Sequence, residues 1–119
     1  MSNFFEGVPY LEVNDFNADG SLKSYVGNGK PVVVMIQRDG CSHCTRAKPA
    51  YQAAHNSCTD VVFATVQSDH PIDTARQAAK FTPAAGVPMF IRFDASGKPA
   101  GAYNGNRSSE SFIEFGRGK

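Results

Sequence analysis

The sequence KPVVVMIQRDGCSHCTRAKP, residues 30–49, places two cysteines between an apolar run and a stretch with helical spacing. Residues 30–37 form a continuous, β-branched apolar run, which is typical of a strand buried on both faces of a sheet. After the cysteines, small residues and a tyrosine recur at i, i+3, i+4 and i+7, which predicts a helix with one face packed on a sheet. They are Ala47, Ala50, Tyr51 and Ala54. The helix should begin near Cys41 and fade by Asn56, so Cys41 lies where a buried strand gives way to a helix.

The rest of the chain alternates between strand and helix patterns. We expect a strand at 8–13, a helix around 22–26, a second buried strand at 60–67, a helix at 70–81, a hairpin of 87–93 with 100–103, and a closing helix within 107–119. Alternating strands and helices favour parallel pairing in the first half of the chain, and the hairpin adds antiparallel strands. The sequence therefore predicts an α/β fold, a mixed central sheet with helices on both faces, in a single domain spanning residues 1–119.

Composition excludes several classes of protein. The chain has 119 residues, 41% of them hydrophobic, which suits one modest core. With 12 basic and 11 acidic residues the net charge is +1, and no basic block could neutralise a run of phosphates, so we expect no nucleic-acid partner. The start of the chain lacks a basic segment followed by an apolar one, and no window approaches membrane-spanning length. We therefore expect a cytoplasmic protein that does not associate with membranes.

The spacing of Cys41 and Cys44 suits two kinds of chemistry. Two intervening residues let the sulfurs either bond to each other or converge on one metal ion. Because the chain has 3 cysteines and one close pair, it does not read as a disulfide scaffold. A structural zinc site is one alternative, since His55 and Cys58 could complete a set of four ligands. The predicted helix argues against this site, because a rise of about 1.5 Å per residue would carry the two pairs apart.

Four features, in this order, resemble the thioredoxin superfamily, including its domains of the protein disulfide isomerase type. They are VVVMIQRDGCSHC, Pro49 five residues after the second cysteine, GVPMF at 86–90, and YNGNRSSESFIEF near the end of the chain. The resemblance covers the chain from Tyr10 to Phe115. In that family a cis-proline lies opposite the cysteine pair, and Pro88 is the residue that matches it.

The resemblance implies a thiol-disulfide oxidoreductase that acts on disulfides or thiols of protein substrates and needs neither an organic cofactor nor a metal. The backbone of Val87 would pair with an extended substrate segment, while Gly40 and Gly105 would line the rest of a shallow contact surface. A flavin reductase or glutathione would be the electron donor, and we expect a monomer. The middle residues Ser42 and His43 are closer to the Gly-His of protein disulfide isomerase than to the Gly-Pro of thioredoxin.

The start of a helix gives the two sulfurs different chemistry. Unpaired N–H groups and the positive end of the helix dipole stabilise a thiolate on Cys41, and a protonated His43 adds a nearby cation. Such surroundings lower a cysteine pKa from about 8.5 to roughly 3.5–7.5, so Cys41 is the predicted nucleophile. Cys44, one turn later, should be more buried and should resolve the mixed disulfide. Because His43 stabilises the reduced form, we expect an intermediate, isomerase-like potential, more oxidising than that of thioredoxin.

Two departures from the family favour an alternative function. Gly40 stands where relatives commonly carry tryptophan, and Met35 stands where thioredoxins carry a buried acid that assists proton transfer. The alternative is a binding module that keeps the fold but has little redox turnover. Outside the motif, we expect His55 and His70 to be solvated, and Cys58 to be a semi-buried or surface thiol that takes no part in the redox reaction.

Overall fold

A mixed sheet of four strands forms the centre of the computed structural model, which describes residues 5–119. The strands are β1 (Val32–Gln37), β2 (Val62–Gln67), β3 (Met89–Phe93) and β4 (Pro99–Tyr103). Their order across the sheet is β2-β1-β3-β4; β1 is parallel to β2 and antiparallel to β3, and β3 is antiparallel to β4. The parallel first pair and the late hairpin agree with the sequence prediction.

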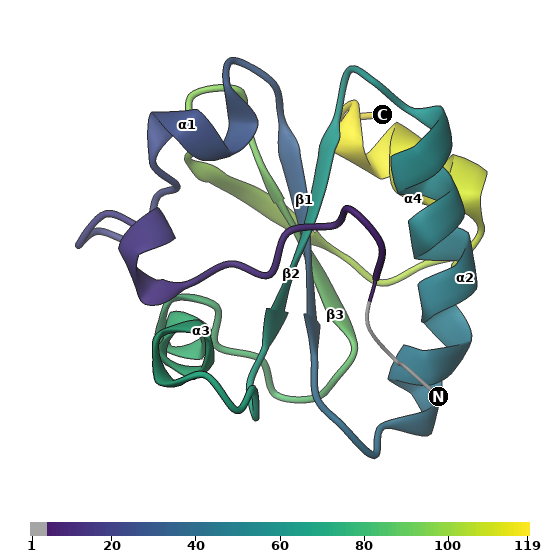
Figure 1. Ribbon diagram of the computed structural model, residues 1–119. Helices are drawn as coiled ribbons and strands as arrows, with labels where there is room; N and C mark the ends of the chain where they lie inside the picture. Colours follow the sequence, from purple (N-terminus) through teal and green to yellow (C-terminus); the bar gives the residue numbers. More distant parts are fainter. Residues whose placement is uncertain (1–4) are drawn as a thin grey trace.

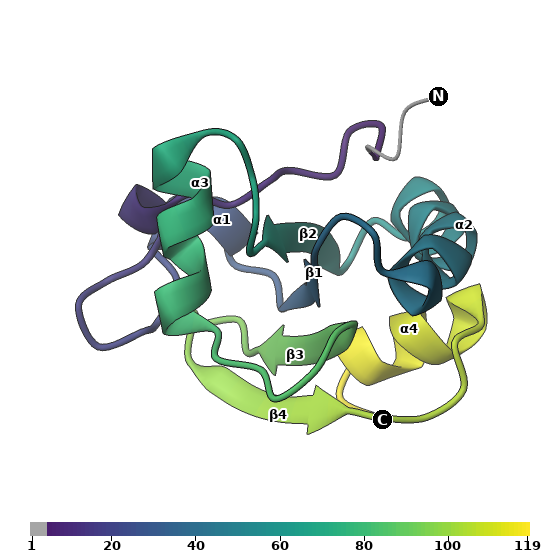
Figure 2. The ribbon, with the colours of Figure 1, turned by 90° about the horizontal axis from the view of Figure 1, so that it is seen from below.

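Helices cover both faces of this sheet. They are α1 (Ser24–Gly27), α2 (Ser42–Ser57), α3 (Asp73–Gln77) and α4 (Ser109–Gly116), together with two short 3₁₀ helices, η1 (Val13–Asp15) and η2 (Ala78–Phe81). Figure 1 and the perpendicular view in Figure 2 show α2 and α4 on one side of the sheet and α1 and α3 on the other. The predicted fold class is therefore confirmed. No helix within residues 5–119 is long and apolar enough to cross a membrane.

The apolar run of β1 is buried on both faces because its side chains alternate between two packed layers. Val33 and Met35 contribute to the layer beneath α2 and α4. The alternate residues contribute to the layer beneath α1 and η2; these are Val32, Val34 and Ile36. A continuous apolar run, which by itself could belong to a strand or a helix, is thus explained by a central strand.

Tyr51 fastens α2 to the two parallel strands. Its ring contacts three buried phenylalanines, which are Phe63, Phe90 and Phe112. Its hydroxyl lies 2.8 Å from Val33 O on β1 and 2.7 Å from Ala64 O on β2, and its single proton can be donated to one of these carbonyls at a time. Burial raises the pKa of this hydroxyl well above its usual value, so the group remains a donor.

The N-terminal segment departs from the sequence prediction. The strand predicted at residues 8–13 is wrong, because Tyr10 alone forms an isolated parallel bridge, with Thr65 of β2. Glu12 instead donates its N–H to Asp15 Oδ2 at 2.8 Å, which caps η1 and turns the chain away from the sheet edge. Residues 1–4 lie outside the described residues. The predictions that include them, a single domain from residue 1 and a start of the chain that is not a signal sequence, are therefore not tested there.

The helix predicted at residues 70–81 starts later and changes type. His70 Nδ1 accepts the N–H of Ile72 at 3.0 Å, which holds a turn, and the first residue of α3 is Asp73. From Ala78 the chain continues as the 3₁₀ helix η2. The predicted α-helix is therefore shortened at both ends. The turn held by His70 delays its start, and the 3₁₀ hydrogen-bonding pattern of η2 replaces its last turn.

Candidate active site

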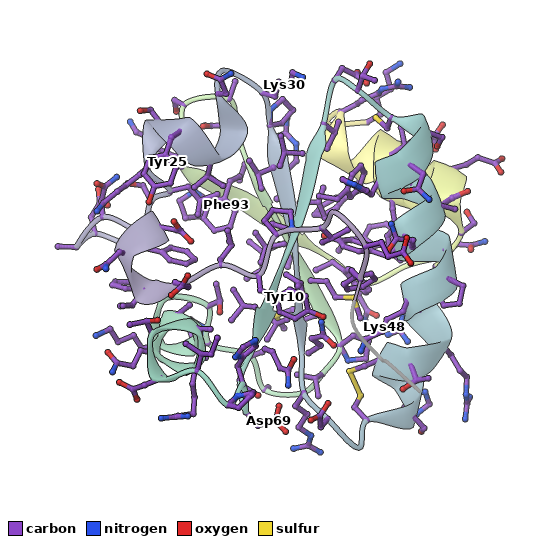
Figure 3. All side chains as sticks on the ribbon, in the orientation of Figure 1. Tyr10, Tyr25, Lys30, Lys48, Asp69 and Phe93 are labelled. Carbon is purple, nitrogen blue, oxygen red and sulfur yellow. A yellow bond between two sulfur atoms is a disulfide. The ribbon has the colours of Figure 1, made fainter. Side chains whose placement is uncertain are left out.

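The two cysteines of the C-x-x-C motif form a disulfide at the start of α2. Cys41 is the N-cap residue, with extended backbone angles (φ −93°, ψ 106°), and its Cα lies 5.2 Å from that of Cys44. The Cys44 N–H donates to Cys41 Sγ at 3.1 Å, so the sulfur occupies the place of a capping oxygen. Figure 3 shows the disulfide as a yellow bond at the amino end of α2. The helix begins where the sequence predicted.

The two cysteines differ in burial. Cys44 is 0% exposed, whereas Cys41 is 8% exposed, so Cys44 is the more buried of the two, as expected. Part of the cover over Cys41 comes from Val87, whose carbonyl oxygen lies 3.7 Å from Cys41 Sγ. A reagent that approaches from solvent therefore meets Cys41 before Cys44.

A segment distant in sequence completes the surroundings of Cys41. The Val87–Pro88 peptide bond is cis, and it immediately precedes β3. Val87 packs against the core cluster that contains both cysteines. Figure 1 shows the connection that leads to β3 passing the carboxyl end of β1, close to the turn that enters α2. The fold thus brings Val87 and Cys41 together at one end of the sheet.

A residue that sequence reasoning missed holds the loop before Cys41. Asp69 accepts the Asp39 N–H with both carboxylate oxygens at 3.1 Å, and Gln67 Nε2 donates to Asp69 Oδ1 at 3.1 Å. Asp69 follows β2, whose carboxyl end lies beside that of the parallel strand β1. The sequence could have indicated Asp69, since it is a polar residue just after the second buried strand. Ligands and functional groups gather at the carboxyl ends of parallel strands.

Three further residues that the sequence placed at the site have different surroundings. Gly40 has φ +75°, and a Cβ there would have no atom within 4 Å, so the surface beside Cys41 is open. His43 is exposed in the first turn of α2. Gly105 lies in the connection between β4 and α4, where a Cβ would come within 2.8 Å of Tyr103 Oη. The tuning role of His43 and the substrate contact of Gly105 stay predictions.

The position beneath the cysteines is apolar. Met35 is 0% exposed and belongs to the same core cluster as both cysteines. None of the buried polar residues between positions 5 and 119 is an aspartate or a glutamate. Lys48, labelled in Figure 3 on α2, has its pKa lowered chiefly by burial, while the negative charges of Asp39 and Asp69 act in the opposite direction. Proton transfer at Cys44 therefore has no buried carboxyl group to use.

The alternative zinc site is not assembled. Cys41 and Cys44 are bonded to each other at the amino end of α2, and Cys58 is the C-cap residue at its other end. The 16 residues of α2 lie between Cys41 and Cys58, a helix length of about 24 Å, and Cys44 lies in the first turn of that helix. Within the described chain, no group of three potential ligands lies close enough together to hold a metal ion. The structure therefore does not bring together the four residues of the zinc hypothesis.

His70 and Cys58, which lie outside the C-x-x-C motif, are both buried. His70 is 8% exposed, with its ring 5.5 Å from that of Tyr10, so the prediction of a solvated histidine is wrong there. Cys58 is also 8% exposed, and its thiol donates to Asp60 Oδ1 at 3.0 Å. Burial, and then this hydrogen bond, raise the pKa of Cys58. His55 is half-buried on α2.

Comparison with known proteins identifies the family. Residues 18–117 match the family described as the thioredoxin-like domain, and the chain belongs to that family. A thioredoxin-like protein of Invertebrate iridescent virus 6, designated 453L, is 40% identical, and the match covers 56% of each chain. Protein disulfide-isomerase tigA of Aspergillus niger is 28% identical over 82% of this chain and 27% of its own length. The chain thus spans about half of the viral relative and about a quarter of the fungal one.

Solved structures confirm the fold. Thioredoxin f from spinach chloroplast (short form) superposes with a TM-score of 0.69 at 20% identity and covers 98% of this chain and 99% of its own. Human ERp44 form I gives a TM-score of 0.71 at 20% identity over 98% of this chain and 30% of its own. The fold together with the paired cysteines supports a redox role in general.

Proposed function

We propose that the protein is a thiol-disulfide oxidoreductase that acts on protein disulfides and thiols through Cys41 and Cys44. The observation that carries this proposal is the disulfide at the amino end of α2, with Cys41 Sγ 3.7 Å from the carbonyl oxygen that precedes Pro88. A cysteine pair that serves only to stabilise a fold has no need of this placement at the start of a helix and beside an open surface.

The reaction proceeds in two exchange steps. With the pair reduced, the Cys41 thiolate attacks one sulfur of a substrate disulfide, forms a mixed disulfide and releases the other substrate sulfur as a thiolate, which takes a proton from water. Cys44 then loses its proton, attacks Cys41 Sγ and releases the second substrate thiol. The products are a reduced substrate and the Cys41–Cys44 disulfide seen here. A thiol donor, either glutathione or the dithiol of a flavin reductase, returns the two electrons, and with an oxidised partner the steps run backward.

The start of α2 favours negative charge on Cys41. Its sulfur already accepts the Cys44 N–H at 3.1 Å, and this hydrogen bond strengthens when the acceptor is a thiolate. The positive end of a 16-residue helix acts on the same atom. His43, exposed in the first turn, adds charge when protonated.

The substrate is a polypeptide segment that lies beside the active site in an extended conformation. Val87 supplies backbone groups for pairing, and the open surface at Gly40 admits the chain without a side-chain obstacle. Gly105 extends this contact surface. The protein works as a monomer in the cytoplasm.

Reduction of insulin by a thiol donor tests the proposal. The wild-type protein should accelerate precipitation of the insulin B chain above the rate of the donor alone, and Cys41→Ser should abolish the acceleration. Arg46→Gln, which removes an exposed charge on α2 but neither sulfur, is the matched control. A wild-type rate equal to that of the donor would contradict the proposal.

A binding module with slow or incidental cysteines is the second candidate. It is favoured by Met35, which leaves proton transfer at Cys44 without a buried acid. The module would capture protein partners at the same surface, and Cys41→Ser would leave that capture intact. Loss of capture together with insulin reduction in this variant would instead favour the oxidoreductase.

A further inference from the structure

A cleft of about 600 Å³ adjoins the active site on the side of Val87. It lies between the carboxyl ends of β1 and β2 and the segment that connects η2 to β3. The residues that matter for its chemistry are Ile36, Arg38, Ser68, Thr82, Gly86 and Val87. The cleft therefore combines apolar walls with a small number of polar groups, which is typical of a binding site for a side chain or small group.

Two polar side chains of this cleft lack partners. Thr82 is 1% exposed, and its Oγ1 has no hydrogen-bond partner among the described residues. Arg38 is exposed at the rim, and no ion pair or hydrogen bond of its guanidinium occurs within residues 5–119. Buried hydroxyls are nearly always paired, so an occupant that offers an acceptor would satisfy Thr82. Arg38 is the one charged residue in the lining of the cleft.

We propose that this cleft binds the carboxylate of an aspartate or glutamate side chain of the polypeptide substrate. The planar guanidinium of Arg38 can donate two parallel hydrogen bonds to a carboxylate. Thr82 Oγ1 is buried in the lining of the cleft, and its hydroxyl can donate a third hydrogen bond once the side chain turns toward the occupant. Ile36 and Val87 provide an apolar surface for the methylene groups of the same side chain. Thr82 and Arg38 thereby become residues that determine substrate specificity. This inference rests on the proposed oxidoreductase function.

The position of the cleft predicts where the acidic residue lies in the substrate. Val87 belongs to both places, since its carbonyl oxygen is 3.7 Å from Cys41 Sγ and the residue also lines the cleft. An extended chain advances about 3.3 Å per residue, so a side chain one or two positions from the substrate cysteine reaches the cleft. The preferred substrate therefore carries Asp or Glu within two residues of its reacting cysteine.

Peptides that differ at one position test the proposal. Each peptide contains one cysteine, held as a mixed disulfide with thiopyridine, and has Glu, Gln or Lys one or two residues from it. The rate of thiopyridine release by the reduced wild-type protein should be about fivefold higher for the Glu peptide than for the Gln peptide, and lowest for Lys. This ratio should shrink as salt is added, because a rim-exposed guanidinium is screened.

Four variants assign the preference to the cleft. Arg38→Gln should bring the Glu-to-Gln ratio to about one, and Arg38→Glu should favour the Lys peptide. Thr82→Val, which keeps the side-chain shape and removes the donor, should lower the ratio, whereas Thr82→Ser should restore it. Arg46→Gln removes an exposed positive charge of α2 that does not line the cleft, and it should keep the wild-type ratio.

The outcomes separate the subsite from the reaction. Equal rates with the Glu and Gln peptides, at values above those of a free thiol, would overturn the subsite and leave the oxidoreductase function in place. Rates no higher than those of a free thiol with every peptide would overturn both. If Arg38→Gln slowed the reaction with oxidised glutathione but left the peptide ratio unchanged, the carboxylate would be that of glutathione, and the assignment to a polypeptide would be wrong.

Discussion

Cys41 and Cys44 carry the same side chain but have different surroundings, and this difference sets their chemistry. Cys41 caps α2, accepts an N–H group and lies beside Val87, whereas Cys44 is one turn along and 0% exposed. The helix field fades within its first turn, and burial in apolar surroundings disfavours a thiolate. We therefore expect the two sulfurs to react in a fixed order.

Alkylation of the reduced protein checks this order. At a pH where an ordinary thiol barely reacts, iodoacetamide should label Cys41 first, as read by mass mapping. Cys44→Ser should keep that reactivity and accumulate mixed disulfides with substrates, because the resolving attack is missing, and Cys41→Ser should abolish both. Labelling of Cys44 or Cys58 ahead of Cys41 would show that the nucleophile is assigned to the wrong residue.

His43 is expected to tune the potential of the pair. Its protonated ring stabilises the reduced, thiolate-bearing form, so His43→Pro should shift the reduction potential to a more reducing value, measured by equilibration with glutathione. Ser57→Ala at the opposite end of α2 is the control and should leave the potential unchanged. A potential that is identical in wild type and His43→Pro would remove His43 from the mechanism.

The hydroxyl of Tyr51 should contribute to stability through one buried hydrogen bond. Tyr51→Phe leaves the carbonyls of Val33 and Ala64 without this donor, so the free energy of unfolding should fall by about 1–3 kcal/mol, measured with urea. Tyr25→Phe is the control, because Tyr25 is 61% exposed and its hydroxyl bonds to Asp15 at the surface. Equal losses in the two variants would contradict the special role of Tyr51.

At the scale of the elements, a polar clamp joins the ends of α2 and α4 to the start of β2. Asp60 accepts the Cys58 thiol at 3.0 Å and two hydrogen bonds from Arg117, at 2.8 and 3.0 Å. Cys58 caps the C-terminus of α2, and Arg117 caps that of α4. The hydrogen bonds from Arg117, and then the one from Cys58, hold the pKa of Asp60 well below its usual range.

This clamp predicts a specific dependence of stability on pH. Because the pKa of Asp60 is lower in the folded than in the unfolded state, its contribution is fully present above about pH 4 and is lost as the pH falls through the folded value. Arg117→Gln should therefore be less stable than wild type at pH 7, and the difference should vanish in strong acid, as measured by urea unfolding at each pH. The effect is small because both side chains are solvent-exposed.

Lys30→Gln provides the control for the clamp. Lys30 is an exposed cation with no ion pair in the described part of the chain. The difference in the free energy of unfolding between Lys30→Gln and wild type should therefore not depend on pH between pH 2 and pH 7. An equal deficit of Arg117→Gln at pH 2 and pH 7 would show that Arg117 acts through packing rather than through the charge of Asp60.

At the scale of the whole molecule, stability comes from two packed layers around one sheet. The layer beneath α2 and α4 contains the cysteines, and the layer beneath α1 and η2 contains the opposite face of β1. The residues of the zinc hypothesis are not brought together, because Cys58 lies at the opposite end of α2 from Cys41 and Cys44. The fold should therefore be stable without metal.

Removal of metal provides the corresponding measurement. Protein purified without chelator should contain no stoichiometric zinc by elemental analysis, and EDTA should leave the Tm unchanged. The comparison should be repeated with the pair reduced, since only free thiols can bind metal. A fall in Tm on chelation, with zinc near one ion per chain, would restore the zinc hypothesis.

Local pattern alone determined much of this protein. The apolar run before the cysteines indicated the central strand, the spacing of Ala47, Tyr51 and Ala54 indicated α2, and their junction indicated a reactive Cys41 at a helix start. These features depend on the spacing of apolar residues and on helix-start signals within a few residues, so they can be recognised in a short segment without the rest of the chain. The same local reasoning failed at residues 8–13 and at His70, where hydrogen bonds within the turn replaced the expected element.

Only the tertiary structure decided which distant groups meet. It placed Val87 against Cys41, set Asp69 beneath the Asp39 N–H, and left Thr82 unpaired in a cleft beside the active site. The first two are contacts between segments far apart in the chain, which the sheet brings together near the carboxyl ends of β1 and β2. Periodicity within a segment carries no information on such pairings, because they arise from the order of strands across the sheet and from how the loops close.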